Sequence, residues 1–260
     1  MIDLGALLPE VCDIADRAGI AVMEVYARDF ETVYKNDHSP VTDADIAAEA
    51  IITPALQALL PGVPVVAEEA ASAGRIPTVG DRPFWLVDPL DGTKEFVNRN
   101  GEFTVNIGLI VDSRPVLGVV LAPAMGASYA GAEGQGASMR RDGGARAPIH
   151  VRHTPAAGLT VVASRRHGDP ETIQRYLAGR PLADTRNAGS SVKFCLLASG
   201  EADLYPRFGP TMEWDTAAGH AVLNAAGGRV TTEDGAELRY AKPNFRNPNF
   251  IAWGGDTPAA

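Results

Sequence analysis

Apolar residues recur three or four positions apart along residues 4–25 of the chain. This spacing predicts an amphipathic first helix. A polar loop follows, and Thr42 is then a candidate N-cap for a second helix that runs toward Leu60, with Asp45 in its first turn. Pro54 lies inside that helix and is expected to kink or interrupt it, because proline lacks the amide hydrogen that a helix interior uses.

Short apolar runs bounded by turn residues fill the middle of the chain, which is the pattern of β-strands. We expect strands at residues 63–67, 84–87, 104–111, 116–121 and 127–132. The polar residues 112–115 predict a hairpin between two of these strands. Residues 131–148 are rich in glycine and arginine, and we expect a loop or hairpin there and a boundary between two lobes.

Strand and helix patterns alternate in the second half of the chain. We expect strands at residues 159–163 and 202–206, and helices at 171–177, 191–197 and about 215–226, the last closed by two glycines. The order of elements predicts an α/β (or α+β) fold with mixed sheets. We expect one domain over residues 1–260, with approximate lobes at 1–148 and 149–260.

Composition and charge exclude several classes of partner. The chain has 260 residues, of which 45% are hydrophobic, so it can bury a sizeable core. Its 23 Lys and Arg against 32 Asp and Glu give a net charge of −9, which offers no general attraction for nucleic-acid polymers or anionic bilayers. The two cysteines, Cys12 and Cys195, lie in apolar helical patterns and predict buried free thiols.

The sequence also bears on location and assembly. Its first residues carry acids where a secretory signal needs basic residues, and the longest apolar run, residues 116–125, is too short to span a bilayer. We therefore expect no integral membrane segment and a cytoplasmic location, with peripheral attachment at the inner membrane left open. Monomer and homodimer both stay open, because no apolar stripe is distinguishable from core.

The segment Asp88-Pro89-Leu90-Asp91-Gly92-Thr93 comes directly after the apolar run 84–87. A strand that ends this way can present both carboxylates and the intervening carbonyl on one side, and proline restricts the backbone between them. Glycine lets a ligand approach the backbone, and the next amides favour an anion at a helix start. Mg²⁺ prefers such oxygen ligands. The segment predicts a metal-phosphate site, with an Asx-type turn as the alternative.

Further acids end or begin other predicted elements. Glu68 and Glu69 follow the run 63–67, and Asp215 opens the last predicted helix. Taken alone, the glutamates would be a solvated strand end and Asp215 a helix N-cap. Together with the aspartates they predict a shared cation site. None of the five histidines has ligand spacing, and we expect His220 to be a packing or surface residue.

Two segments, residues 85–93 and 214–219, resemble the paired motifs of the inositol monophosphatase superfamily, and Glu68 lies 20 residues before Asp88 as it does there. These proteins are Mg²⁺-dependent, lithium-sensitive phosphatases, and the resemblance covers essentially the whole chain. Residues 94–96, 99–107 and 205–211 are most similar to its bacterial 3′(2′),5′-bisphosphate nucleotidases. The resemblance implies a layered αβαβα sandwich of the inositol monophosphatase and fructose-1,6-bisphosphatase type.

The resemblance also implies roles for the acids, with two to three Mg²⁺ ions per site. The implied ligands are Glu68, Asp88 and the Leu90 carbonyl for the first ion, Asp88, Asp91 and Asp215 for the second, and waters near Glu68 for a weaker third. Asp45 would hold the Thr93 hydroxyl, and this catalytic pair would orient the attacking water. Asp43 is the alternative to Asp45, and Glu69 the alternative to Glu68.

In the related nucleotidases a Ser-x-x-Lys and a later Arg hold the second phosphate. The matching residues here are Ser190, Lys193 and Arg207, and His167 is a candidate contact to the base or ribose. Without the resemblance, Lys193 and Arg207 would be ordinary exposed charges. The transferring phosphate would also contact Glu68, Leu90, Asp91, Gly92, Thr93 and Asp215.

The implied reaction is hydrolysis of adenosine 3′,5′-bisphosphate to AMP and phosphate, with the sulfated analogue as a second substrate and a link to sulfate assimilation. Inositol monophosphate or fructose 1,6-bisphosphate would be the substrate in the alternative that keeps the chemistry. A non-catalytic metal or phosphate sensor is a third possibility. We disfavour the sensor because Asp45 and Thr93, which serve water activation and not binding, are both present.

Overall fold

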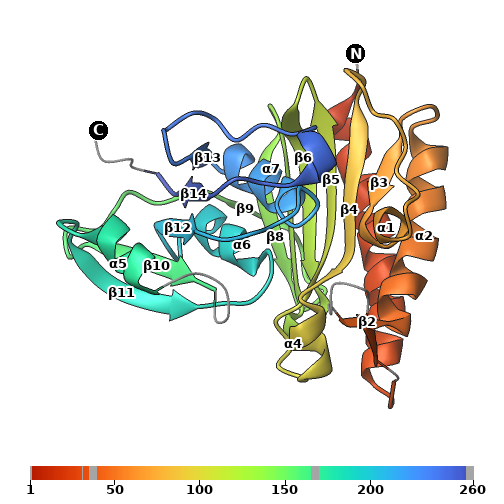
Figure 1. The fold of residues 1–260 in the computed structure, drawn as a ribbon, viewed down its shortest axis with the longest axis horizontal. Coiled ribbons are helices and arrows are strands. Elements are labelled where there is room, and N and C mark those ends of the chain that lie inside the picture. Colours follow the sequence, from red (N-terminus) through yellow and green to blue (C-terminus); the bar gives the residue numbers. More distant parts are fainter. Residues whose placement is uncertain (1, 31, 35–39, 165–169, 256–260) are drawn as a thin grey trace.

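The computed structural model describes residues 2–30, 32–34, 40–164 and 170–255 (Figure 1). Its helices are α1 (Leu4–Tyr26), α2 (Asp43–Leu59), α3 (Glu68–Ser72), α4 (Thr93–Val97), α5 (Pro170–Leu177), α6 (Val192–Ala198) and α7 (Ala217–Ala225), with short 3₁₀ turns η1 (Pro123–Met125) and η2 (Pro243–Phe245). Its strands are β1 (Thr32–Tyr34), β2 (Pro40–Thr42), β3 (Val65–Ala67), β4 (Phe84–Asp91), β5 (Thr104–Val111), β6 (Arg114–Ala122), β7 (Ala127–Ala132), β8 (Gly136–Arg141), β9 (Ala147–Ile149), β10 (Leu159–Ala163), β11 (Leu182–Asn187), β12 (Leu204–Arg207), β13 (Arg229–Thr232) and β14 (Phe250–Trp253).

Two large sheets organise the chain, and both are mixed. The first has the order β3-β4-β5-β6-β7-β8-β9, with β3 parallel to β4 and every later pair antiparallel. The second has the order β11-β10-β12-β14-β13, with β10 parallel to both of its neighbours and β14 antiparallel to β12 and β13. A small antiparallel pair, β1-β2, stands apart from them. The predicted α/β class with mixed sheets is confirmed.

The elements form five layers in the order helix, sheet, helix, sheet, helix. Helices α1 and α2 cover one face of the seven-stranded sheet, and α6 and α7 lie between the two sheets (Figure 1). Helix α5 covers the outer face of the five-stranded sheet, where Tyr176 and Leu177 pack against a cluster of strand residues. One buried cluster joins β6 and β7 to α6, α7 and β12, so both sheets share core with the middle helices. The predicted division near residue 148 falls within β9 and stays a prediction.

Glycines on three neighbouring strands explain how closely α7 approaches the first sheet. A Cβ on Gly118 would lie 2.2 Å from the carbonyl oxygen of Ala218, and one on Gly108 would lie 2.9 Å from the Ala217 side chain. On the next strand, a Cβ on Gly131 would lie 2.8 Å from the Ala225 side chain. Only residues without a side chain fit at such distances. These glycines therefore set the position of α7, whose first residue follows Asp215 by two.

The first two predicted helices are present with nearly the expected limits. Thr42 caps α2 through a capping box with Asp45, as its position in the sequence indicated. Of the two effects predicted for Pro54, the interruption of α2 is wrong, because the helix continues through this residue to Leu59, and the kink stays a prediction. Burial of Ile52 and Leu56 on either side of the proline offsets the one hydrogen bond that the helix loses there.

Several other limits differ from the expectation. Strand β4 continues through Asp91, and α7 begins at Ala217 and not at Asp215. The glycine-rich segment forms β8 and β9, an antiparallel pair that confirms the predicted hairpin and extends the first sheet. The pattern missed β11, whose six residues are all exposed, as well as β13 and β14. Within the described ranges, no helix has both the length and the hydropathy that crossing a membrane requires.

Candidate active site

A cavity of about 250 Å³ opens where the end of β4, the start of α6 and the turn before α7 meet. It is lined by Glu68, Asp91, Gly92, Thr93, Lys94, Glu95, Ser164, Gly189, Ser190, Lys193, Phe194, Tyr205, Arg207, Pro210, Thr211, Asp215 and Thr216. Eight of the predicted site residues are among them. Asp45, Asp88 and Leu90 are buried and are not part of the wall. His167 lies outside the described residues.

The end of β4 carries two carboxylates, one on either side of an irregularity in its pairing with β5. Asp88 pairs with Asn106 and Asp91 with Thr104 on β5, and the register shifts between the two pairs. The backbone N–H of Leu90 donates to Asp88 Oδ1 over 3.0 Å, which is the Asx-type turn considered above. The turn and the convergence of acids therefore coexist, because a single carboxylate oxygen serves the turn.

Gly92 follows the strand in a left-handed conformation, with φ at +92°. A Cβ at this position would lie 3.1 Å from the carbonyl oxygen of Glu102 and 3.3 Å from the Ser190 side chain. Both the backbone angle and the crowding favour glycine here. The conformation lets α4 begin at once with Thr93, whose single hydroxyl hydrogen can be donated either to the Leu90 carbonyl at 3.3 Å or to Asp45 Oδ1 at 3.4 Å.

Asp45 reaches the same point from the first turn of α2. Its Oδ2 accepts hydrogen bonds from both the backbone N–H and the hydroxyl of Thr42, each at 2.8 Å, and its Oδ1 accepts from the Thr93 hydroxyl at 3.4 Å. Burial raises the pKa of Asp45 to about 7. The alternative residue, Asp43, is exposed. The structure thus brings Asp45 and not Asp43 to Thr93.

The opposite wall of the cavity carries two cations. Lys193 is only 4% exposed, and its Nζ donates to the carbonyl oxygens of Ser190 at 2.5 Å and Ala188 at 3.3 Å. Arg207 is 7% exposed, and its Nη2 donates to the Pro210 carbonyl at 2.9 Å. The interpretation of these residues as ordinary exposed charges is wrong, because both belong to the wall of a cavity.

The Nε of Arg207 is buried and has no hydrogen-bond partner within the part of the chain that the structure describes. A buried donor without a partner is costly, so its presence beside a cavity indicates that a ligand accepts from it. The pKa of Lys193 is lowered to about 8, chiefly by burial, with Asp91 acting in the opposite direction and Arg207 adding to the decrease. An anion between the two cations would relieve their mutual repulsion.

Asp215 lies in a turn directly before α7. Its Oδ2 accepts from the Met212 backbone N–H at 2.8 Å, and Thr216 occupies the N-cap position that the sequence had suggested for Asp215. Because only one of its oxygens serves the turn, Asp215 can offer the other to a ligand in the cavity.

The profile described as "Inositol monophosphatase family" matches residues 4–256. The chain belongs to this family.

Individual relatives agree with the family assignment. The chain is 49% identical to the 3′(2′),5′-bisphosphate nucleotidase CysQ of Escherichia coli K12, over 94% of this chain and 98% of that protein. Among solved structures it is similar to CysQ from Bacteroides thetaiotaomicron, with a TM-score of 0.79 and 37% identity over 97% of this chain and 98% of that one. The inositol monophosphatase from Anabaena matches with a TM-score of 0.76 and 26% identity over 98% and 92% of the two chains.

In this member of the family, the acids around the cavity strongly affect one another. Burial raises the pKa of Asp88 and Asp215, and repulsion from neighbouring carboxylates, Glu68 and Asp91 among them, raises both further. Burial also raises the pKa of Asp91, against the opposing effect of Lys193. The positive groups of the chain therefore do not fully balance the negative charge of these carboxylates when they are ionised. Within the described ranges no three Asp, Glu, His or Cys side chains already stand in ligating positions around one point. The acids converge on one region, and ligation of a cation would need side-chain movements.

Three residues for which no role was predicted from the sequence hold the acids in place. Glu49, one turn after Asp45 on α2, accepts the backbone N–H groups of Glu69 at 2.9 Å and Ala70 at 3.0 Å and so fixes the start of α3, where Glu68 stands. The second and third are Asn106 and Ser191. Asn106 Nδ2 donates to Asp91 Oδ2 at 3.4 Å and to Ser191 Oγ at 3.0 Å.

Ser191 completes this connection, because its hydroxyl donates to the Asp215 carbonyl at 2.7 Å. Ser190 has φ at +45°, and its hydroxyl pairs with that of Thr104 at 2.7 Å, while Gly189 donates its N–H to Glu102 at 2.8 Å. Asn106 could have been recognised in the sequence, because it is a polar side chain inside an otherwise apolar strand. The signal for Glu49 is its position one turn after Asp45.

Proposed function

We propose that this chain is a 3′(2′),5′-bisphosphate nucleotidase that hydrolyses adenosine 3′,5′-bisphosphate to AMP and phosphate, with the 3′-phosphosulfate analogue as a second substrate. The observation that carries the proposal is the division of one cavity between converging carboxylates and the buried cations Lys193 and Arg207. A substrate that has one phosphate to be hydrolysed and a second to be bound matches the acidic and the cationic wall of the cavity. The 49% identity to CysQ of Escherichia coli supports the same substrate class.

The acids fit a divalent cation of the magnesium type. All of their ligand atoms are oxygens, and burial together with repulsion from neighbouring carboxylates raises the pKa of Asp88 and Asp215, an effect that a bound cation would offset. We assign Glu68, Asp88 and the Leu90 carbonyl to a first ion and Asp88, Asp91 and Asp215 to a second, with a weaker third near Glu68. Mg²⁺, when bound, would supply positive charge to the transferring phosphoryl group and lower the pKa of nearby water.

Asp45 and Thr93 then handle the proton of the attacking water. When the Thr93 hydroxyl donates to Asp45 rather than to the Leu90 carbonyl, a lone pair on its oxygen can accept a proton from water while Thr93 gives its own proton to the carboxylate. The water oxygen forms the new bond to phosphorus as the bond to the nucleoside 3′-oxygen breaks, and that oxygen leaves with a proton from solvent. The backbone amides of Gly92 and Thr93 face the charge that develops on the phosphoryl oxygens.

Lys193 and Arg207 hold the phosphate that is not hydrolysed. Arg207 has a buried Nε–H that no described residue accepts, and Lys193 is kept in place by the carbonyls of Ala188 and Ser190. In a chain of net charge −9, these two side chains supply the local positive charge that a bisphosphate requires. Their task is binding, so their loss should raise KM more than it lowers kcat.

The test is phosphate release from adenosine 3′,5′-bisphosphate, inositol 1-phosphate and fructose 1,6-bisphosphate, each with Mg²⁺ and with EDTA. We expect release that depends on Mg²⁺ and a kcat/KM that is highest for the nucleotide. A preference for inositol 1-phosphate or fructose 1,6-bisphosphate would keep the cation site and overturn the assignment of the cationic wall. Binding of the nucleotide without release from any of the three would favour a sensor.

A further inference from the structure

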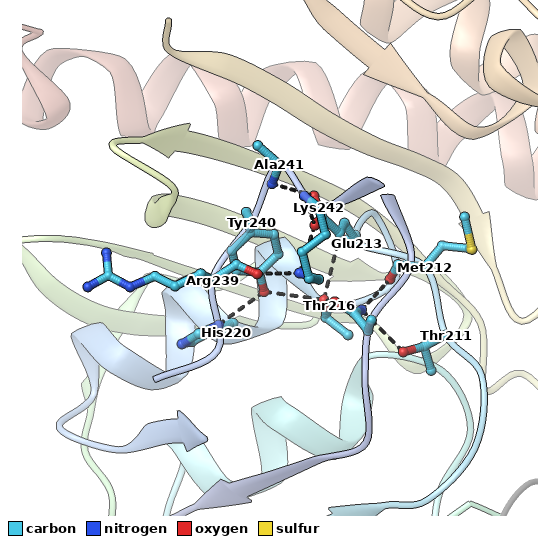
Figure 2. Close-up of polar contacts among 10 residues, drawn as sticks. Thr211, Met212, Glu213, Thr216, His220, Arg239, Tyr240, Ala241 and Lys242 are labelled. Atoms are coloured by element: carbon cyan, nitrogen blue, oxygen red, sulfur yellow. Dashed lines mark hydrogen bonds and ion pairs between the residues drawn. The ribbon is translucent and has the colours of Figure 1, made fainter. Parts of the chain in front are cut away.

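A fully buried carboxylate that the proposed reaction does not use lies in the turn between Thr211 and Asp215, two residues that line the cavity. Glu213 is 0% exposed, and it accepts the backbone N–H of Ala241 and of Lys242, each at 2.9 Å. The Lys242 ammonium lies 2.7 Å from Glu213 Oε1, with its own side chain 23% exposed (Figure 2). Three donors thus converge on one carboxylate, so its negative charge holds these donors and their backbone in place.

The same turn carries Asp215. The Met212 N–H donates to Asp215 Oδ2, and the Asp215 N–H donates back to the Met212 carbonyl at 3.2 Å, so Glu213 lies inside the loop that these two bonds close. The Thr216 hydroxyl, in the N-cap residue of α7, donates to the Glu213 carbonyl at 3.1 Å. A shift of Glu213 would therefore move the backbone from which the Asp215 side chain projects.

The segment that Glu213 holds is itself attached to the turn at further points. The Glu213 N–H donates to the Phe245 carbonyl at 2.8 Å, and Asn247 Nδ2 donates to the Met212 carbonyl at 2.8 Å. Ala241 has φ at +67°, a conformation that is unfavourable for alanine and that turns its N–H toward Glu213. The charge of Glu213 stabilises this local geometry.

We propose that Glu213, paired with Lys242, is a positioning residue that fixes Asp215 for divalent cation binding. This inference rests on the proposed cation site but not on the identity of the substrate. Glu213 does not line the cavity, so it acts through the backbone of the turn. Removal of its charge loosens the turn and weakens cation affinity, while leaving every oxygen ligand in the chain.

The variant Glu213→Gln removes the charge with almost no change of shape. One amide oxygen cannot satisfy the donors that two carboxylate oxygens accept, and the amide hydrogens would face other hydrogens. Lys242→Met removes the ammonium from the other side and is better tolerated in folding, since this side chain is partly exposed. Asp203→Asn is the matched control. Asp203 is likewise buried, outside the cavity wall and paired with a cation, Arg152 at 2.8 Å, but its side chain bonds to Arg152 and Thr160 and not to the segments that hold the Asp215 turn.

The experiment is a direct Mn²⁺ titration of each protein, with free Mn²⁺ followed by electron paramagnetic resonance, together with the thermal midpoint in EDTA. We expect Glu213→Gln to weaken Mn²⁺ binding about 10-fold, in line with partners that orient metal ligands, and Lys242→Met to weaken it by a smaller factor. Asp203→Asn should lower the thermal midpoint and leave Mn²⁺ affinity unchanged. At saturating Mn²⁺, the kcat of Glu213→Gln should return to within about twofold of the wild type.

The proposal is overturned if folded Glu213→Gln binds Mn²⁺ like the wild type, or if Asp203→Asn weakens binding equally, since the effect would then be general destabilisation. Should Glu213→Gln fail to fold, an unchanged Mn²⁺ affinity in Lys242→Met overturns it. Failure of the proposed function looks different, because the wild type would then bind Mn²⁺, and Glu213→Gln would bind it more weakly, but neither would hydrolyse adenosine 3′,5′-bisphosphate.

Discussion

The Thr93 hydroxyl donates a hydrogen bond to Asp45 across 48 residues of sequence, over 3.4 Å. Asp45 is the capping-box residue of α2, and Thr93 is the first residue of α4, so two helix starts meet at this bond. Thr42 occupies the other oxygen of Asp45 with two hydrogen bonds, which leaves a single carboxylate oxygen to face Thr93. The pair is therefore oriented before any substrate arrives.

Replacement of Thr93 tests the role of its hydroxyl. Thr93→Val keeps the shape and removes the proton path, so we expect kcat to fall about 100-fold or more, the usual contribution of general acid–base groups. Thr93→Ser retains the hydroxyl and should keep most of the activity. Steady-state kinetics at saturating Mg²⁺ measure both, and equal activity of the two variants would exclude the hydroxyl from the reaction.

Asp91→Asn tests the carboxylates, with opposite effects on activity and stability. The variant should lose hydrolysis by more than about 100-fold, because even partners that only orient metal ligands contribute 10- to 100-fold. Its thermal midpoint in EDTA should be unchanged or higher, since burial already penalises the charged form of Asp91. A large fall in the midpoint, measured by circular dichroism, would show that the charge serves folding and not catalysis.

Gly92→Ala and Gly62→Ala form a pair in which only the surroundings differ. Both glycines have positive φ, +92° and +84°, but a Cβ at Gly62 meets nothing within 4 Å. Each substitution should lower the free energy of unfolding by about 1 to 2 kcal/mol, because alanine is strained in this conformation. Only Gly92→Ala should also reduce kcat/KM, since its Cβ crowds Glu102 and Ser190. Equal kcat/KM in the two variants would contradict the account.

Stability in EDTA should fall as the pH rises. Folding raises the pKa of Asp45 from 3.8 to about 7 and raises those of Asp88, Asp91 and Asp215. Between those values the folded chain holds protons that the unfolded chain has released, so the free energy of unfolding decreases from about pH 4 to above pH 7.

Mg²⁺ should reverse that decrease, because the cation binds the ionised carboxylates. The increase in thermal midpoint on adding Mg²⁺ should therefore be larger at pH 8 than at pH 5.5; at 100 times its dissociation constant a ligand adds about 2.7 kcal/mol. Thermal melts at the two pH values, each with Mg²⁺ and with EDTA, measure it. An increase that is independent of pH would contradict a cation site made of these acids.

The sequence predicted those parts of the site that are determined by residues adjacent along the chain. The carboxylates at the end of β4 and the cap of α2 could be located because each follows from a short local pattern. The fold class followed from the order of strands and helices. Strand β11 was missed because all six of its residues are exposed, so no alternation of burial marks it.

What the sequence could not give are contacts between residues far apart along the chain. Glu49, Asn106 and Glu213 act on segments 15 to 85 positions away, so a local pattern can single out such a residue but does not identify its partner. The burial of Lys193 and Arg207 likewise follows from packing between α6 and β12, whereas charged residues in short elements are usually exposed.

The central claim is that one cavity hydrolyses one phosphate and holds another. The most direct measurement compares kcat/KM for adenosine 3′,5′-bisphosphate and adenosine 3′-monophosphate in the wild type and in Lys193→Met. Hydrogen bonds to charged groups contribute about 1.5 to 3 kcal/mol, so the wild type should prefer the bisphosphate by at least about 10-fold, mainly through KM. Lys193→Met should lose most of this preference while its kcat/KM for the monophosphate changes little. A preference that survives in the variant, or that is absent from the wild type, would contradict the account.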